Sequence, residues 1–373
     1  MMNSTTYHPE NSTASILPGA RWQSVYQTLD SFGVAVPGGR AGPVGVGGLT
    51  IGGGNSFFAA RYSFVCDDVV NFEVVLANGS IINANNHTNS DLFKALKGGS
   101  NNFGIVTKID LYAFPQGDRG VVSYDNSTST TAQLIPAIVN FTNHVEDDPY
   151  VSLITFWQYS STSGANVIVN ALEYTKPVAN PPVFSQIVSI VNTSSTMRIA
   201  SLYELTSELA QVSGFRELFL TLTFVNDARV IEKAVGLHNS LIEEAKASVR
   251  SIEWTFETIF QPLPALFSRR SVARGEMFLA WTVFLFDLSW QDAADDALFH
   301  RIGDTMVSQL TSYARTIHAD NEFIYLNYAD RSQNPLRSYG AANLAYIRQV
   351  AEKYDPAGVF QTLVPGGFKV TAA

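Results

Sequence analysis

The sequence has little cysteine and little positive charge, and each shortage excludes a class of function. Cys66 is the single cysteine among 373 residues, so neither an intrachain disulfide nor a cysteine-based zinc site can form. Lys and Arg number 24 against 33 Asp and Glu, which gives a formal net charge of −9. Because an acidic surface repels phosphate backbones, we expect no nucleic-acid partner.

Long apolar runs are also missing. A membrane-spanning helix needs about 18 consecutive apolar residues, and the best stretch, residues 277–288, is interrupted by Trp, Thr and Asp. We therefore expect no membrane partner. Residues 1–16 lack the basic start and apolar core of a signal peptide, so no signal peptide is visible. These residues are also polar and show no periodic pattern, so we expect them to be disordered.

Glycine is average in number but unevenly distributed. Ten of the 26 glycines fall between Gly33 and Gly54. Glycine at this density argues against a regular helix and often lets successive backbone N–H groups face an anion, although tight turns alone are an alternative explanation. The segment lacks both the GxGxxG spacing of dinucleotide-binding folds and the GxxxxGK[ST] sequence of phosphate-binding loops.

Apolar periodicity predicts the secondary structure around the glycine-rich segment and near the C-terminus. We expect helices over residues 21–31, 91–97 and 341–354, a hairpin over 72–84 around Asn78-Gly79, and strands over 105–112 and 323–328.

The middle of the chain has longer, aromatic-rich strands. They are expected over residues 150–159, 166–174, 217–225, 252–260 and 277–287, with helices over 227–246 and 292–318.

The length of the chain predicts two domains, or three. This order of elements predicts an α+β fold in which helices cover a largely antiparallel sheet.

Several segments, in order, resemble the flavin domain of the vanillyl-alcohol-oxidase superfamily. They are GGRAGPVGVGGLTIGGG, ARYSFVCDDV, LANGSII and DLFKALKGGSNNFGIVT. The C-terminal segments YLNYAD, SYG and VAEKYDPAGVFQTLVPGGFK resemble the closing module of the same family. More narrowly, the chain is similar to the fungal berberine-bridge-enzyme-like FAD oxidoreductases.

The resemblance implies a PCMH-type FAD-binding domain and an antiparallel-sheet substrate domain covered by helices. Residues 17–117 would form the second lobe of the FAD-binding domain and residues 118–322 the substrate domain. Residues 323–373 would return to the flavin domain. Residues 1–16 are unmatched, and we expect the family's first lobe to be missing, so that the chain is truncated.

The resemblance also implies the residues of a flavin site. Asn327 would lie against the isoalloxazine ring, and Tyr325, on the same strand face, is a candidate base. A buried aromatic with a satisfied hydroxyl is an equally good interpretation of Tyr325. The residues that would contact FAD through the glycine-rich segment and the adenosine side are Gly39, Val44, Gly45, Gly47, Gly48, Gly52, Gly53, Gly104, Ile105 and Val106.

A covalent flavin link is not expected. Ala41 occupies the family's cysteine position, and none of the six histidines lies in the family-type histidine loop. We expect Cys66 to pack as a small apolar residue beside the cofactor loop. The histidines, His238 among them, are expected at the surface, and no pair has the spacing of metal ligands.

Two functions follow from the resemblance. The first is an FAD-dependent oxidoreductase that oxidises an alcohol, carbohydrate or secondary metabolite by hydride transfer to flavin N5, with molecular oxygen as a candidate acceptor. The alternative is a non-redox remnant that binds a small ligand without flavin chemistry. Full-length relatives are expected to be secreted, and seven Asn-x-Ser/Thr sequons fit a secreted ancestor.

Overall fold

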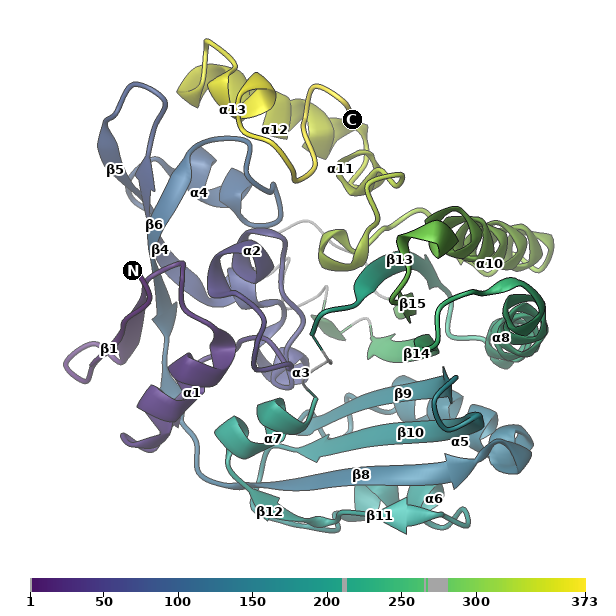
Figure 1. Ribbon diagram of the computed structural model, residues 1–373. Coiled ribbons are helices and arrows are strands. Elements are labelled where there is room, and N and C mark those ends of the chain that lie inside the picture. Colours follow the sequence, from purple (N-terminus) through teal and green to yellow (C-terminus); the bar gives the residue numbers. More distant parts are fainter. Residues whose placement is uncertain (1, 210–212, 265, 268–280) are drawn as a thin grey trace.

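The computed structural model describes residues 2–209, 213–264, 266–267 and 281–373. Two antiparallel sheets, one of five strands and one of nine, organise this part of the chain (Figure 1). Each sheet packs against helices and has its own hydrophobic core. The predicted α+β fold is confirmed.

The smaller sheet carries the glycine-rich segment and the C-terminal helices beside it (Figure 1). Its order is β1-β2-β6-β4-β5, with strands β1 Thr5–His8, β2 Thr13–Ile16, β4 Val69–Val75, β5 Ile81–Ala84 and β6 Ile105–Tyr112. One face packs on helices α1 Trp22–Asp30, α4 Ser90–Leu96 and α12 Ala341–Tyr354. The predicted hairpin, strand 105–112 and three helices in this region are confirmed.

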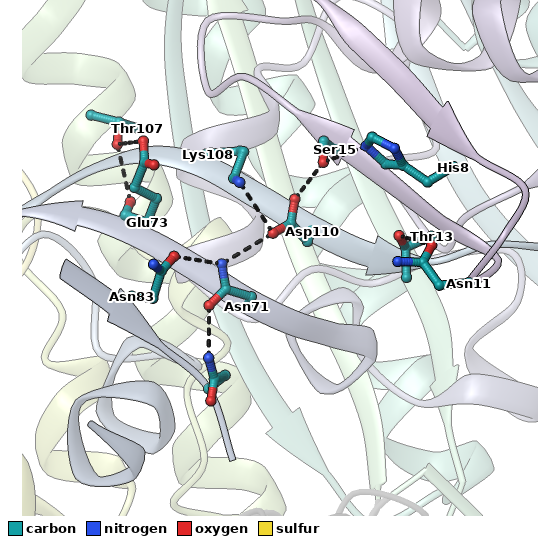
Figure 2. A network of polar contacts seen from close by, with 11 residues as sticks. His8, Asn11, Thr13, Ser15, Asn71, Glu73, Asn83, Thr107, Lys108 and Asp110 are labelled. Carbon is teal, nitrogen blue, oxygen red and sulfur yellow. Dashed lines mark hydrogen bonds and ion pairs between the residues drawn. The ribbon is translucent and has the colours of Figure 1, made fainter. Parts of the chain in front are cut away.

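The opposite face of the smaller sheet carries a polar network (Figure 2). Asp110 accepts hydrogen bonds from Ser15 Oγ at 2.6 Å and from Asn71 Nδ2 at 3.0 Å, and Lys108 Nζ lies 3.6 Å from its carboxylate. Ile109, between these residues on β6, is buried in the core. The alternation from Lys108 to Leu111 helps to fix the register of β6, because a slip of one residue would turn these side chains to the wrong face.

The prediction that residues 1–16 are disordered is wrong. Strands β1 and β2 form a hairpin with Thr5 opposite Ile16, and Ile16 in turn lies opposite Ile109 of β6. Ala14 and Ile16 are fully buried. Two inward-facing side chains give too short an apolar pattern to recognise from sequence, and the surrounding polar residues pair through their backbones.

The larger sheet forms the second half of the molecule, in the order β11-β8-β10-β9-β14-β15-β13-β16, with β12 beside β8. Its strands are β8 Arg119–Ser127, β9 Val151–Ser160, β10 Ala165–Tyr174, β11 Ser194–Ser195, β12 Arg198–Ala200, β13 Arg216–Phe224, β14 Trp254–Leu263, β15 Trp281–Trp290 and β16 Asp320–Asn321. The predicted long strands are confirmed, except that residues 277–280 lie outside the described part.

One face of the larger sheet packs on three helices, α5 Thr131–Asn143, α8 Ala228–Ser248 and α10 Asp296–Thr316. The two helices predicted between these strands, α8 and α10, are confirmed. Helix α7, Leu202–Glu208, falls within the range assigned to the substrate domain but packs its Leu202 and Leu205 into the core of the smaller sheet. Within the described residues, no helix has both the length and the apolar composition needed to cross a membrane.

Several short elements lie between or after these longer ones. They are the strand pair β3 Val34–Ala35 and β7 Phe114–Pro115, and helices α2 Val46–Ile51, α3 Ala59–Tyr62, α6 Ser185–Val188, α11 Pro335–Ser338 and α13 Val359–Thr362. Helix α2 corrects the expectation that the glycine-rich segment holds no regular helix. Val46 and Thr50 are buried on one side of α2, and this packing outweighs the low helix propensity of Gly47 and Gly48.

His238 corrects a second expectation, because it is fully buried rather than at the surface. It lies on the apolar face of α8, four residues after Ala234 and three before Leu241. Its Nδ1 is 2.9 Å from Thr258 Oγ1 on β14, and its Nε2 is 3.3 Å from Asn166 Oδ1. Burial lowers the pKa of His238 to about 3, so the folded chain holds the ring neutral.

We predict that His238 makes folding stability depend on pH. The folded pKa lies below the unfolded value of about 6.5, so its stabilising effect is present above pH 6.5 and is lost as the pH falls toward 3. Between pH 7 and pH 5 this linkage amounts to about 2 kcal/mol. Urea unfolding should show wild type losing that much more stability than His238→Gln. The exposed His87→Gln should behave like wild type; equal pH dependence in all three would contradict the assignment.

Candidate functional site

A cavity of about 1040 Å³ lies where the glycine-rich segment, the C-terminal segment and the larger sheet meet. Ligand pockets commonly measure about 300 to 1,000 Å³, so this one is at the upper end of that range. Its lining comes from both halves of the fold: Val44, Gly45 and Gly48 on one side, Tyr325 and Asn327 beside them, and side chains of β9, β13, β14 and β15 opposite.

The predicted cofactor glycines divide into two groups. Gly45 and Gly48 line the cavity, and a Cβ built on either would meet no described atom within 4 Å apart from its own chain neighbours. The open space in front of them leaves their backbone accessible to a ligand. Val44 lines the same wall and is partly exposed.

The other predicted glycines of this segment do not line the cavity, and close packing or a positive φ accounts for them. A Cβ on Gly52 would lie 1.9 Å from Asn327 Oδ1, and one on Gly39 would lie 2.5 Å from Trp22 Cδ1. Gly47 faces Pro18, and Gly53, which has φ of +113°, lies beside the Tyr325 ring. These glycines let the segment pack closely against α1 and the C-terminal segment.

The predicted adenosine-side residues lie apart from the cavity. A Cβ on Gly104 would lie 2.5 Å from Val74 Cγ1, so this glycine allows β6 to approach β4. Ile105 is exposed at the start of β6, and Val106 packs against the core of the smaller sheet. Cofactor contact by these three residues stays a prediction.

The side chains of Tyr325 and Asn327 are hydrogen-bonded to each other, but the backbone that carries them is not the predicted strand. Residues 323–328 do not form a strand, because the chain turns into a 3-10 helix at Leu326–Tyr328, closed by Tyr328 N–H donating to Tyr325 O at 3.0 Å. Asn327 Nδ2 nevertheless donates to Tyr325 Oη at 3.1 Å and to Leu49 O at 3.0 Å. Both side chains line the cavity.

The Tyr325 hydroxyl is buried and held by two donors. Besides Asn327, the backbone N–H of Asn55 donates to Tyr325 Oη at 2.6 Å. Burial raises the pKa of Tyr325 and the neighbouring Tyr328 adds to this, whereas Asn327, Arg40 and Asn55 act in the opposite direction. Burial dominates, so the phenol is neutral at physiological pH, with its two donors already placed to support a negative oxygen.

A second polar cluster adjoins this pair. The Arg40 guanidinium, from the glycine-rich segment, donates through Nη2 to Tyr328 Oη at 2.8 Å and to Gln261 Oε1 of β14. Gln261 Nε2 also donates to Tyr328 Oη at 3.1 Å. This Arg40–Gln261–Tyr328 cluster therefore joins three segments of the chain at the edge of the cavity and gives that end a positive charge.

The sheet wall opposite carries carboxyl groups. Glu257 of β14 and Asp287 of β15 are directly opposed in register, and Glu217 of β13 is diagonal to Asp287 on the same face. Burial, with the nearby Glu257, raises the pKa of Glu217 to about 7. Burial also raises the pKa of Glu257, which accepts a hydrogen bond from Gln158 on the next strand.

Sequence reasoning missed the residues of this wall and of the Arg40–Gln261–Tyr328 cluster. Alternation along residues 252–260 places Glu257 on the same face as Thr255 and Ile259, and that signal was available. Which strands are neighbours, and in what register, depends on long-range pairing that no local pattern encodes. The cross-strand meeting of Glu257 and Asp287 therefore could not be read from the sequence.

Ala41, at the family's cysteine position, and Cys66 lie in different surroundings. Ala41 lines the cavity, and Cys66 is buried beside the glycine-rich segment, where its N–H donates to Gly53 O at 2.9 Å. The expectation that Cys66 packs as a small residue next to this segment is confirmed. Within the described part of the chain, no group of three or more His, Cys, Asp or Glu is arranged to hold a metal ion.

Comparison with known proteins identifies the family. Residues 1–85 match the FAD binding domain family, so the first 16 residues are matched after all. The chain is 44% identical to FAD-dependent monooxygenase drtC of Aspergillus calidoustus, over 99% of this chain and 72% of that protein. It is also 44% identical to FAD-dependent monooxygenase sdcF of Emericella nidulans, over 100% of this chain and 80% of that protein.

The chain belongs to the berberine-bridge-enzyme-like FAD oxidoreductases. Solved structures agree on the fold of this oxidoreductase. It superposes on 6-hydroxy-D-nicotine oxidase from Arthrobacter nicotinovorans with a TM-score of 0.79 at 19% identity, covering 96% of this chain and 79% of that one. Carbohydrate oxidase from Microdochium nivale gives 0.77 at 20% identity, with the same coverage of 96% and 79%.

The residues around the cavity fit the FAD that this family binds. Gly45 and Gly48 present backbone to open space, as close approach of a flat or phosphorylated group requires. Asn327, Asn101 and Gly367 also line this cavity and bring polar groups to its wall. These are the groups that would hold the cofactor in this oxidoreductase.

We predict that alanine substitution separates packing glycines from cofactor glycines. Gly52→Ala places a Cβ within 1.9 Å of Asn327 Oδ1, so overpacking should cost roughly 1–3 kcal/mol in urea unfolding. Gly45→Ala, which faces the open cavity, should leave apoprotein stability almost unchanged and weaken FAD binding. If Gly45→Ala destabilised the apoprotein as much as Gly52→Ala, the division would be wrong.

Proposed function

We propose that this oxidoreductase oxidises an alcohol, carbohydrate or secondary metabolite, with bound FAD accepting the hydride at N5. The observation that carries the proposal is that the open glycines, the Tyr325–Asn327 pair and the sheet wall all face one cavity. A cofactor held on the Gly45 and Gly48 side would leave the sheet side for the substrate. Both reacting partners would then share one site.

Tyr325 is the proposed base for the substrate hydroxyl. Because the resting phenol is neutral, it would first release its proton to solvent, and the phenolate would then take the proton of the substrate hydroxyl and become the phenol again. Asn55 N–H and Asn327 Nδ2 donate to this oxygen, so they would stabilise the phenolate. Asn327 Nδ2 also donates a hydrogen bond to Leu49 O, which positions the Asn327 side chain against helix α2. The pair therefore fixes the phenol relative to the glycine side of the cavity.

The names of similar proteins support parts of this proposal. Two relatives at 44% identity are named FAD-dependent monooxygenases, which supports molecular oxygen as the acceptor. Structures with the same fold include xylooligosaccharide oxidase in complex with xylobiose and a carbohydrate oxidase in complex with a substrate analogue. A carbohydrate bears hydroxyl groups, so these two neighbours support a hydroxyl-bearing small molecule as the substrate class.

We predict that Tyr325→Phe slows turnover without releasing the cofactor. Loss of a general base costs roughly 10²- to 10⁴-fold in kcat. The measurement is anaerobic flavin bleaching by a panel of oligosaccharides and phenolic alcohols, with circular dichroism to confirm folding. Tyr346→Phe is the matched control, since its hydroxyl donates to Asp91 O away from the cavity.

Two results would count against the proposal. A chain without flavin absorbance after incubation with FAD would contradict the oxidoreductase function, and it would favour the non-redox alternative. Unchanged bleaching rates and pH profile in flavin-loaded Tyr325→Phe would remove Tyr325 as the base.

A further inference from the structure

The middle of the sheet wall presents an apolar row to the cavity. Alternate residues of each long strand face the cavity, and the register aligns them across the strands. Ile259 of β14 lies opposite both Phe156 of β9 and Leu285 of β15, and all three line the cavity. Ile259 and Leu285 belong, with Ile154 and Ala171, to a buried apolar cluster against which Phe156 packs. Phe156, Ile259 and Leu285 therefore form a continuous surface, the apolar row.

Aromatic rings continue this surface toward the proposed base. Phe219 of β13 and Tyr328 pack against the same apolar cluster, and their rings meet edge to face with centroids 6.2 Å apart. The Tyr328 ring meets the Tyr325 ring in the same manner at 4.8 Å. Phe156, Phe219 and Tyr328 all line the cavity and are partly exposed.

The width of this surface suits a flat ring system. Strands β9 and β13, which carry Phe156 and Phe219, are separated by β14 and β15. At about 4.8 Å between neighbouring strands, the two outer strands lie roughly 14 Å apart. A fused ring system can therefore lie across the row with an aromatic side chain near each end.

The polar side chains that border the apolar row are hydrogen-bonded to one another. These contacts are Gln158 with Glu257, Glu217 with Asp287, Thr255 with Ser289, and Arg40 and Gln261 with Tyr328. Their hydrogen bonds are made within the protein, so a ligand that brings many hydroxyl groups would have to compete for them.

We propose that the cavity selects an alcohol or phenol carried on an apolar, ring-bearing body, such as a fused aromatic system, in preference to a carbohydrate. The body lies on the apolar row, and its hydroxyl group lies toward Tyr325. This inference rests on the proposed function, because it takes the cavity as the substrate site, and it narrows the substrate class of that site.

Desolvation favours such a ligand over a sugar. A ring face laid on the apolar row removes apolar surface of both partners from water, which favours binding in proportion to the area covered. Edge-to-face contacts with Phe219 and Tyr328 add to this gain. A sugar hydroxyl in the same place loses its hydrogen bonds to water and meets carbon, and an unpaired polar group is costly to bury.

Three probes test the preference. Phenol and 2-naphthol carry the same hydroxyl group on one ring and on two fused rings, and neither has a carbinol hydrogen to transfer as hydride, so binding is measured without turnover. Xylobiose carries hydroxyl groups around both of its rings. Each probe is titrated by anaerobic calorimetry into the full chain, with and without FAD.

The proposal predicts a clear order of affinity. The second ring covers more of the apolar row, so 2-naphthol should bind roughly tenfold more tightly than phenol. Xylobiose should bind more weakly than either. Titrations at several temperatures should give a negative heat-capacity change that is larger in magnitude for 2-naphthol, as burial of apolar surface requires.

Substitutions identify the residues responsible. Phe156→Thr removes a ring from the row while keeping a residue suited to a strand, and it should weaken 2-naphthol binding roughly tenfold. Phe219→Thr serves as a second variant if the first folds poorly. Phe32→Thr is the matched control, because Phe32 is 57% exposed after the end of α1 and its ring lies against Tyr7, outside the cavity lining. It should leave all three affinities unchanged.

Several results would overturn the inference. They are xylobiose binding as tightly as 2-naphthol, no gain from the second ring, no binding of any probe, or an unchanged 2-naphthol affinity in both variants. Displacement of 2-naphthol by FAD would also overturn it, since the flavin would then cover the apolar row.

Failure of this inference is distinguishable from failure of the proposed function. A chain that binds no flavin yet binds 2-naphthol through Phe156 retains the apolar site without the oxidoreductase. A flavin-loaded chain that is reduced by sugars and does not bind 2-naphthol retains only the oxidoreductase.

Discussion

The site depends on one buried hydrogen-bonded junction, in which Arg40 contacts both Gln261 and Tyr328. Arg40 comes from the glycine-rich segment, Gln261 from the larger sheet and Tyr328 from the C-terminal segment. Hydrogen bonds to a charged group contribute about 1.5–3 kcal/mol each when buried, and an unpaired guanidinium there would be costly. The junction therefore holds the three walls of the cavity in one arrangement and places Tyr325 between them.

The two faces of the larger sheet have different roles. Each sheet has one face on its own helices, so the second face of the larger sheet is left to form the cavity wall. Alternation along β9, β14 and β15 separates core side chains such as Phe256 and Phe286 from cavity side chains such as Glu257 and Asp287. The same strands therefore stabilise the fold and present the polar groups of the site.

The sequence predicts the family, the α+β class and most long elements, because periodic apolar faces and ordered motifs are local signals. It predicts that Tyr325 and Asn327 act together, but by way of a strand where the chain makes a 3-10 turn. It fails for residues 1–16 and for His238, where strand pairing and helix packing decide burial. The sequence could not predict that Glu257 lies opposite Asp287 and Gln158, since neighbouring strands and their register depend on contacts between residues up to about a hundred positions apart.

The central claim is that the glycine side of the cavity holds the flavin and the sheet side holds the substrate. A crystal structure of the chain loaded with FAD tests it most directly. The account predicts the isoalloxazine ring inside the cavity, against Gly45, Gly48 and Asn327, with its free face toward Phe156, Glu257 and Asp287. A flavin bound elsewhere, or one whose ring covers the sheet wall and leaves the glycines exposed, would contradict it.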